Sequence, residues 1–467
     1  MEDLPEHLLL DILKRIDRTA DRNSISVVCK RLHRAEAEQR DVLRVGCGLH
    51  PAIEAFTALC SRFQNLLKLE INYTGWKPAL GEQLGNEALQ VLSSNCTSLK
   101  ELSLSFCAFI DDAAIWFLSS CPYLTSLTLN FVPSISSTGI LSAVNCCKNL
   151  STLHLIRCMT VSSTEWLEHL GKSGNLRELS IKNCRGISEV DIIKLGPGWK
   201  KLRKLDFAVD AYYQYPNLHD RLLLDELDQE SVSCDELREL SLTNCIVAPG
   251  HGLSFLLRKC AALEKLLLNM CIGVMHSDFV ALSKKSSNLR ALTVRLPLRL
   301  HGSILENNHL PLRDGSLRAL AAGCPMLNTL DLSFSDWDYP SASFFTQEAL
   351  IAVIQCCPIH ALKLHCAVFF NDIGMRVLGA SQCLQVLELS KCHNVTDRGL
   401  AHIIKLPSIK TVKLFKCVGV SDIGLNPLVD THKLDLLAVE DCPYITDTGI
   451  KGAAKSIVYK QDLSWMY

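Results

Sequence analysis

The sequence predicts an α/β solenoid in which a small helical module precedes a long array of strand–helix repeats, with a parallel inner sheet and outer helices. Three observations predict it. Leucine-type residues recur at intervals that are mostly 25 or 26 residues, each recurrence opens a short alternating apolar segment, and the N-terminal stretch breaks the period. A chain of 467 residues is too long for one ordinary core, and a repeat array accommodates it.

The repeating unit follows the pattern L-x-x-L-x-L. Its anchors are Leu66, Leu99, Leu124, Leu150, Leu176, Leu202, Leu237, Leu263, Leu289, Leu327, Ile359, Leu384, Ile409 and Leu434. Nine of the thirteen intervals between them are 25 or 26 residues, within the range of leucine-rich repeats. We therefore expect about fourteen leucine-rich repeats over residues 49–467, stacked as a right-handed horseshoe solenoid.

Each repeat is expected to pair a strand with a helix. Residues 99–104 show the alternation that sends leucines inward. Residues 396–400, 421–425 and 446–450 continue with Thr/Ser-Asp-x-Gly and then Leu or Ile. Ser, Thr or Asp at that place predicts a cap on the first N–H groups of a helix.

Fifteen of the 22 cysteines fall at two repeat positions. Seven stand three residues before an anchor: Cys96, Cys121, Cys147, Cys234, Cys260, Cys324 and Cys356. Eight stand eight residues after one: Cys107, Cys158, Cys184, Cys245, Cys271, Cys392, Cys417 and Cys442. Equivalent slots along a solenoid predict reduced, buried thiols that act as compact apolar groups, with neither disulfides nor bound metal.

Charge and hydropathy narrow the function classes. Lys and Arg total 48 against 49 for Asp and Glu, so no global field attracts nucleic acid or an anionic membrane. The first residues lack a charged-then-apolar leader, and no run of 18 apolar residues occurs. We expect a soluble protein of the nucleus and/or cytoplasm with no nucleic-acid or membrane partner.

Residues 1–48 are expected to form short helices. Leu8, Leu9, Ile12, Leu13 and Ile16 make a broad apolar stripe at helical spacing. A module this small cannot bury the whole stripe within itself. Either the end of the solenoid or another protein must cover the rest, and the residues alone leave both open.

The Leu4-Pro5 start, the spaced Leu and Ile residues and the Asn-Ser-x-Ser-x-Val-Cys-Lys segment at 23–30 resemble the F-box. With the cysteine-containing repeats, the chain is similar to F-box leucine-rich-repeat proteins, and Arg44-Val45 and His50-Pro51 resemble the plant auxin and jasmonate receptor branch. Leu32 stands where the motif usually has Trp. The resemblance implies these adaptor-binding residues: Leu4, Pro5, Leu8, Leu9, Ile12, Leu13, Ile16, Val28 and Leu32.

By this resemblance, the F-box docks on a Skp-type adaptor that bridges to a cullin and a RING protein. The chain is then the substrate-recognition subunit of an SCF-type ubiquitin ligase and acts by proximity. No Gly-rich phosphate loop, His-Glu-x-x-His or nucleophile elbow is present, which indicates a non-catalytic subunit. The alternatives are a hormone-like small-molecule receptor of the same architecture and a non-degradative scaffold.

Four overlong intervals predict loops near residues 72–86, 208–230, 295–314 and 333–346, all on the rim that follows the strands. Their aromatic residues either bind a substrate or ligand or fold back over the core. The expected binding residues, together with those of the inner face, are Trp76, Tyr212, Tyr213, Tyr215, Arg295, His301, Trp337, Tyr339, Lys363 and His365. No cofactor is expected. The alternative, an inositol polyphosphate, follows from the basic floor of the hormone-receptor branch, of which the mixed inner-face charges here are a thin version.

Overall fold

The structure is a computed structural model that describes residues 4–16, 18–188, 191–210, 234–247, 252–295, 312–334, 346–403, 406–431 and 434–462. The chain divides into two compact units, Met1–Tyr213 and Gln214–Tyr467. They are called unit 1 and unit 2 below, and each is described by itself.

Unit 1 contains parallel strands that pair in chain order. They are β1 (Val42–Gly46), β2 (Lys68–Asn72), β3 (Glu101–Ser105), β4 (Ser126–Asn130), β5 (Thr152–Ile156), β6 (Glu178–Lys182) and β7 (Lys204–Ala208). The register aligns equivalent leucines, so Leu69 pairs with Leu102, and Leu102 with Leu127. These leucines are fully buried and form one continuous row of the core.

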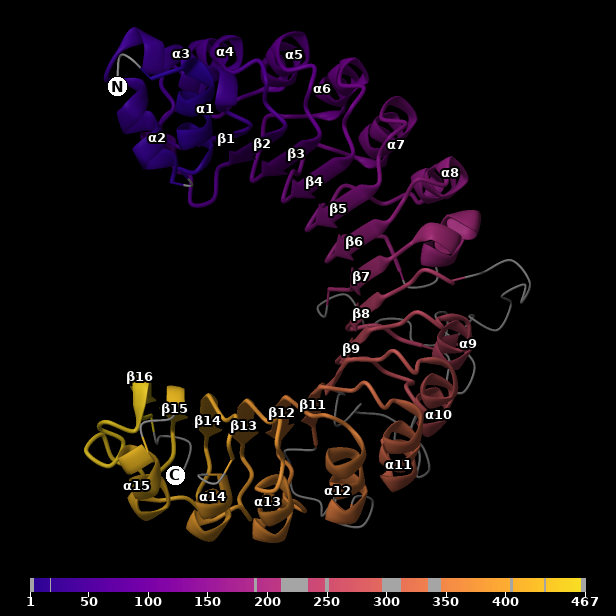
Figure 1. Cartoon of the computed structure of the whole chain (residues 1–467). Helices are drawn as coiled ribbons and strands as arrows, with labels where there is room; N and C mark the ends of the chain where they lie inside the picture. The colour runs from indigo at the N-terminus through magenta and orange to yellow at the C-terminus, as the bar shows by residue number, and fades with distance from the viewer. Residues whose placement is uncertain are drawn as a thin grey trace. The chain divides into compact units, whose positions relative to one another are not determined.

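The helices of unit 1 alternate with its strands after a purely helical start. The α-helices are α1 (Glu6–Lys14), α2 (Thr19–Ser26), α3 (Lys30–Gln39), α4 (Ala52–Arg62), α5 (Asn86–Asn95), α6 (Asp112–Ile115), α7 (Ser137–Cys146) and α8 (Glu165–Ser173). The 3₁₀ segments are η1 (Pro78–Leu80), η2 (Trp116–Ser120) and η3 (Asp191–Lys201). Figure 1 shows strands β1–β7 on one side of this unit and helices α4–α8 on the other.

Unit 2 repeats the arrangement. Its parallel strands are β8 (Glu239–Thr243), β9 (Lys265–Asn269), β10 (Ala291–Arg295), β11 (Thr329–Ser333), β12 (Ala361–His365), β13 (Val386–Ser390), β14 (Thr411–Phe415), β15 (Leu434–Glu440) and β16 (Ala454–Lys460). Its helices are α9 (Gly252–Lys259), α10 (His276–Lys285), α11 (Asp314–Gly323), α12 (Gln347–Cys356), α13 (Asp372–Leu378), α14 (Asp397–Ile403) and α15 (Asp422–Thr431).

Thirteen of the fourteen sequence anchors lie two residues before a strand, from β2 to β14, and the fourteenth, Leu434, is the first residue of β15. The predicted α/β class with a parallel strand layer and a helical layer is confirmed in both units. Two further strands, β1 and β16, extend the pairing at the outer edges of units 1 and 2, respectively. The first of them lies within residues 1–48, so the strand layer begins inside the segment expected to be purely helical.

The cysteine slots are largely as expected. Fourteen of the fifteen repeat-position thiols are buried, and Cys356 is the exception. Its neighbour Cys357 occupies the buried slot instead and donates to the Cys324 carbonyl at 3.4 Å, because this repeat brings its thiol one residue nearer the anchor. Burial raises the pKa of the Cys107 and Cys392 thiols to about 12, which leaves them protonated and weakly nucleophilic at neutral pH.

The buried thiols also link neighbouring repeats. Cys158 Sγ donates to the Leu129 carbonyl at 3.5 Å, and Cys271 Sγ donates to the Leu242 carbonyl at 3.3 Å. In both cases the acceptor belongs to the strand of the preceding repeat. The thiol therefore fills an apolar slot and also satisfies a carbonyl, which a purely apolar residue of the same size does not do.

The Thr/Ser-Asp-x-Gly segments join one repeat to the next. Thr396 Oγ1 accepts a hydrogen bond from the Arg398 N–H, which confirms the predicted helix cap. The Asp372 carboxylate at the start of α13 also accepts from the Thr396 N–H at 2.8 Å and from its hydroxyl at 2.6 Å. Each aspartate thus holds the helix cap of the following repeat.

The same link recurs further along unit 2. Asp397 accepts from the N–H and hydroxyl of Ser421, and Asp422 accepts from those of Thr446. The expectation of a helix after Thr446 is wrong, because residues 447–452 form turns. Strand β16 begins at Ala454, which leaves too few residues for a helix.

We expect Gly399→Ala to lower the free energy of unfolding by about 1–3 kcal/mol, the usual range for an added methyl in a filled site. A Cβ at Gly399 would overlap the Asp372 carboxylate that holds the Thr396 cap. Gly424 and Gly449 stand in the same relation to Asp397 and Asp422. Urea unfolding followed by circular dichroism measures the change.

The matched control is Gly315→Ala in α11. Its added Cβ would meet the Cε1 atom of His276 at 3.0 Å, a looser contact than a Gly399 Cβ would make with the Asp372 carboxylate. Alanine also has the higher helix propensity. Equal losses in the two variants would contradict a specific role for the aspartate contact.

Candidate functional site

The N-terminal module forms its own small core from three helices. Leu9 and Leu13 of α1 pack with Leu32 and Ala35 of α3, and all four are nearly completely buried. The Arg31 guanidinium donates to the Leu4 carbonyl, which joins the start of α3 to the residues before α1. Leu32, the position where the motif usually has Trp, therefore packs within the module.

The same helices present apolar side chains outward. Leu8 is 43% exposed and Ile12 45% exposed, and their spacing of four residues places them on one face of α1. Val27 and Val28, just after α2, are 82% and 69% exposed. Exposed Leu, Ile and Val in so small a module indicate a surface that another protein covers.

The structure separates the nine predicted adaptor-binding residues into three groups. Pro5, Leu8, Ile12 and Val28 are exposed; Leu4 and Ile16 are half-buried; Leu9, Leu13 and Leu32 lie in the core of the module. Val27, which the sequence argument did not single out, is the most exposed of the large apolar residues here. Its signal was its place beside Val28 at the end of a helix.

A buried carboxylate connects the module to the first repeat. The Glu36 side chain is fully buried in α3 and lies 2.5 Å from the Arg40 guanidinium and 3.1 Å from that of Arg62 in α4. Arg22 of α2 lies 4.0 Å away. Burial lowers the pKa of the Arg62 guanidinium, and nearby Glu36 opposes that shift. Glu36 thus holds side chains from α2, α3 and α4 around one charge.

The first long loop, residues 72–86, runs from the end of β2 to α5, as expected for an insertion after the strand. The indole N–H of Trp76 donates to the Gly81 carbonyl at 2.9 Å, and the Tyr73 hydroxyl accepts from the Leu84 N–H at 2.9 Å. Tyr73 is buried and Trp76 half-buried. The loop therefore has internal order, and part of the Trp76 ring remains at the surface.

Aromatic residues also follow strands in repeats of ordinary length. Phe106 and Phe131 come directly after β3 and β4, both with positive φ, and their ring centroids lie 5.2 Å apart. Phe131 is 40% exposed and Phe109 is 59% exposed. The sequence argument missed them because it looked for aromatics only in overlong intervals. The signal of the Phe106–Phe131 pair was a position two residues after the last strand leucine.

In unit 2, strand register brings Arg295 and His365 to either side of Asp331. The Arg295 guanidinium lies 2.6 Å from the Asp331 carboxylate, and His365 Nε2 lies 3.4 Å from it. Burial opposes ionisation of Asp331, but nearby His365 and the hydrogen-bonded Arg295 guanidinium outweigh it and hold the Asp331 pKa below its usual value. Two of the predicted binding residues are therefore partners of one carboxylate.

The other inner-face cations also have acidic neighbours. Lys363 and Lys413 each lie 3.7 Å from the Glu388 carboxylate, between them in the strand order. In unit 1, Lys182 lies 2.5 Å from Asp206. Paired in this way, these cations offer little net positive charge to a polyphosphate.

Six predicted binding residues lie outside the described part of the chain: Tyr212, Tyr213, Tyr215, His301, Trp337 and Tyr339. Within the described ranges, no cluster of three or more His, Cys, Asp or Glu side chains is arranged to hold a metal ion. Of the helices that the structure describes, none has the length and apolarity needed to cross a membrane.

Two family profiles match the chain. The F-box profile matches residues 1–42, and the leucine-rich-repeat profile matches residues 95–115 and 380–403. The first match spans α1–α3 with the exposed Leu8 and Ile12. The second match covers one strand and helix in unit 1 and one in unit 2.

Curated relatives carry similar names. The chain is 28% identical over 127 residues to F-box/LRR-repeat protein 4 of Bos taurus, which covers 27% of this chain and 20% of that protein. It is 24% identical over 403 residues to GRR1-like protein 1 of Arabidopsis thaliana, which covers 79% of this chain and 64% of that protein. The chain thus spans less than two thirds of either relative.

Among solved structures, a chain of the yeast Rad7 and Elc1 complex is similar to this chain, with a TM-score of 0.49 and 18% sequence identity. The alignment covers 79% of this chain and 90% of that chain. The F-box match over the helical module at residues 1–42 and the leucine-rich-repeat matches over one repeat in each unit show that the chain is similar to F-box proteins with leucine-rich repeats.

Proposed function

We propose that the chain is the substrate-recognition subunit of an SCF-type cullin-RING ubiquitin ligase. The observation that carries the proposal is the division of α1, in which Leu9 and Leu13 build the F-box core while Leu8 and Ile12 remain exposed. An F-box joined to leucine-rich repeats supports this role in general terms. The exposed face of α1 binds a Skp-type adaptor, which links the chain to a cullin and a RING protein.

The repeats supply the second surface, which binds a target protein. In unit 1, Trp76 and the Phe106–Phe131 pair lie where strands end, and large aromatic groups at a surface are the usual anchors of protein contacts. The chain itself transfers no acyl group. It raises the local concentration of a substrate lysine near the ubiquitin-charged enzyme.

The proposal includes no resident cofactor. The ion pairs at Asp331 and Glu388 support this, because Arg295 is offset by Asp331, and Lys363 and Lys413 share Glu388, which leaves one net positive charge in that group. A phosphorylated cofactor needs several cations whose charge is not already offset.

The test is co-expression of the chain with a Skp-type adaptor, a cullin and a RING protein, followed by size-exclusion chromatography. We expect one co-eluting complex, and proximity labelling in cells should enrich the same target proteins with and without proteasome inhibition, more strongly with it. A chain that is folded by circular dichroism but elutes apart from the adaptor would contradict the proposal. Adaptor binding without the cullin would instead favour a non-degradative scaffold.

A further inference from the structure

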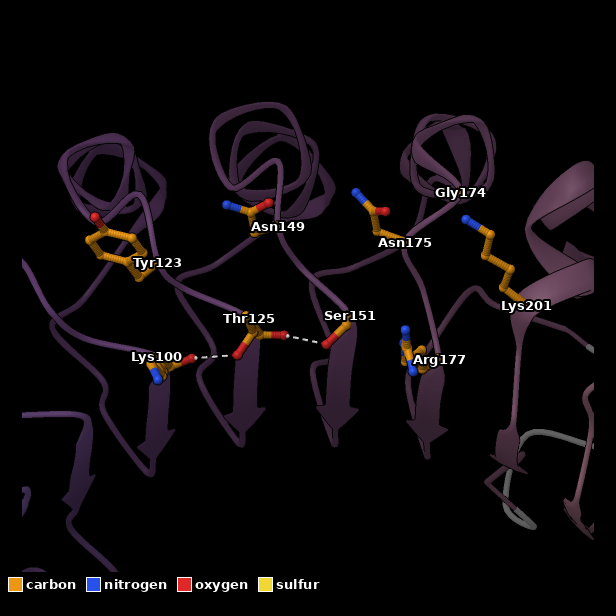
Figure 2. Close-up of a pocket in the computed structure, with 9 residues that line it drawn as sticks. All are labelled: Lys100, Tyr123, Thr125, Asn149, Ser151, Gly174, Asn175, Arg177 and Lys201. Carbon is orange, nitrogen blue, oxygen red and sulfur yellow. Dashed lines mark hydrogen bonds between the residues drawn. The ribbon is translucent and has the colours of Figure 1, made fainter.

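A basic groove lies at the opposite end of the unit 1 strands from Trp76, Phe106 and Phe131. It has a volume of about 350 Å³ and is lined where strands β3–β7 begin. Two rows of side chains form it. They are Lys100, Thr125, Ser151 and Arg177 directly before the strands, and Tyr123, Asn149, Asn175 and Lys201 two residues earlier, with Gly174 beside them. Figure 2 shows both rows.

The side chains of Thr125, Ser151, Asn149 and Asn175 are hydrogen-bonded within the fold. Thr125 Oγ1 donates to the Lys100 carbonyl and Ser151 Oγ to the Thr125 carbonyl, each at 3.2 Å. The side-chain amides of Asn149 and Asn175 donate to backbone carbonyls of the preceding repeats at 2.9 and 3.0 Å. These bonds make the floor rigid and leave the charged side chains as its principal binding groups.

Three cations face this floor: Lys100, Arg177 and Lys201. Within the described part of unit 1, no carboxylate lies within ion-pair distance of them, unlike Lys182 or Lys204, which pair with Asp206 and Glu178. Tyr123 adds a ring that is 59% exposed. The whole chain carries a net charge of −1, so the groove is a local excess of positive charge.

Further lysines lie near the groove. Lys148 is exposed on the turn before β5, Lys172 near the end of α8, and Lys200 near the end of η3. They widen the positive field around the groove without closing it. A concave, rigid site of one charge concentrates ligands of the opposite charge.

We propose that this groove binds an extended acidic segment of a protein, either phosphorylated or rich in Asp and Glu. Lys100 and Arg177 stand three strands apart, which is about 14 Å at the usual spacing of 4.7–4.9 Å. An extended peptide covers about 3.3 Å per residue, so anionic side chains roughly four residues apart meet both cations. The exposed Tyr123 ring offers an apolar face at the Lys100 end of the groove (Figure 2).

This inference rests on the proposed function, because a ligase receptor needs a surface that reads its target. It also separates two binding surfaces by location. Trp76, Phe106 and Phe131 lie after the ends of strands, and the groove lies where strands begin. A target that carries an acidic segment then meets two different parts of unit 1.

The test is fluorescence anisotropy with the whole chain and labelled ten-residue peptides. One peptide carries two phosphoserines four residues apart, a second carries glutamates at those positions, and a third carries serines. We expect the phosphorylated peptide to bind most tightly, since each phosphate carries nearly two charges, and the serine peptide not to bind. The double variant Lys100→Glu/Arg177→Glu should weaken binding roughly a hundredfold, about tenfold for each charge-assisted hydrogen bond that it removes.

The matched control is Arg398→Glu/Lys451→Glu. Both residues are exposed in unit 2 and lie outside the groove, and the change in net charge is the same. An unchanged control with a weakened groove variant supports the proposal. No binding by the unaltered chain, or equal losses in both variants, overturns it.

A single-stranded oligonucleotide of equal charge serves as a further probe. If it binds as tightly as the phosphorylated peptide and responds to the same variant, the groove is a general anion site and the proposal is wrong. Adaptor binding is measured on each variant in parallel, since the F-box residues are separate from the groove. A chain that binds the adaptor but no acidic peptide overturns the groove alone, whereas one that fails to bind the adaptor overturns the proposed function.

Discussion

Replacing Leu8 and Ile12 together with aspartate is expected to abolish binding of a Skp-type adaptor. The two side chains lie one helical turn apart on the exposed face of α1, so both enter the same interface. A carboxylate buried there without a partner costs several kcal/mol, and a loss of about 3–5 kcal/mol corresponds to a roughly hundredfold or greater weakening. Isothermal titration calorimetry with purified adaptor measures it.

The fold should survive this change, because neither side chain belongs to the core of the F-box. The melting temperature therefore serves as an internal control. Ile373→Asp/Ile423→Asp provides the matched surface change, since these residues are 51% and 74% exposed on α13 and α15. An unchanged adaptor affinity in the Leu8/Ile12 variant would contradict the assignment of α1 as the adaptor-binding helix.

Replacing Glu36 with alanine is expected to produce the largest loss of stability. The Glu36 carboxylate is buried and pairs directly with the Arg40 and Arg62 guanidinium groups. The substitution removes this shared partner from both. Removing one member of a buried ion pair typically costs about 3–5 kcal/mol, because the remaining charge stays out of water. Urea unfolding followed by tryptophan fluorescence measures the change, since four of the six tryptophans, Trp76, Trp116, Trp166 and Trp199, lie in unit 1.

Glu101→Ala is the control for that experiment. The Glu101 carboxylate lies 3.2 Å from the Lys68 ammonium but is 51% exposed, so its loss should cost less than about 1 kcal/mol. Comparable losses in the two variants would show that Glu36 behaves as a surface ion pair and not as a buried junction. The Glu36 variant should also weaken adaptor binding, because the helices that present Leu8 and Ile12 become less firmly held.

The strands were predictable because their signal is local and repeated. A strand such as Leu102–Leu104 carries its own alternation, and the same spacing recurs in the next repeat. Strand β1 was not predicted, because Val42–Gly46 follows a helical module and has no leucine anchor two residues before it. Its pairing with β2 is a tertiary contact, which the sequence of one short segment does not predict.

The division of α1 could not be predicted for a different reason. Its apolar stripe is nearly continuous, so which residues become buried depends on where α3 packs. Leu32 and Ala35 cover Leu9 and Leu13 and leave the other face open. Helical periodicity identifies an apolar stripe but does not say which neighbour covers it.

The ion pairs between neighbouring strands could not be predicted from the sequence either. Arg295 and Asp331 stand 36 residues apart, across one of the overlong intervals, and only the register of β10 with β11 places their charges together. The basic groove has the same origin. Lys100 and Arg177 belong to one structural row, but 77 residues of sequence separate them.

The link from Asp372 to Thr396, and from each such aspartate to the next repeat, gives this part of the chain a direction. An earlier repeat supplies the acceptor, and a later one supplies the group that needs it. During synthesis, a newly emerging repeat therefore meets a carboxylate that is already in place, and growth can proceed one unit at a time from the N-terminal side. Shortening the array from its C-terminal side leaves only a solvated aspartate, whereas removing an upstream repeat deprives its successor of a template.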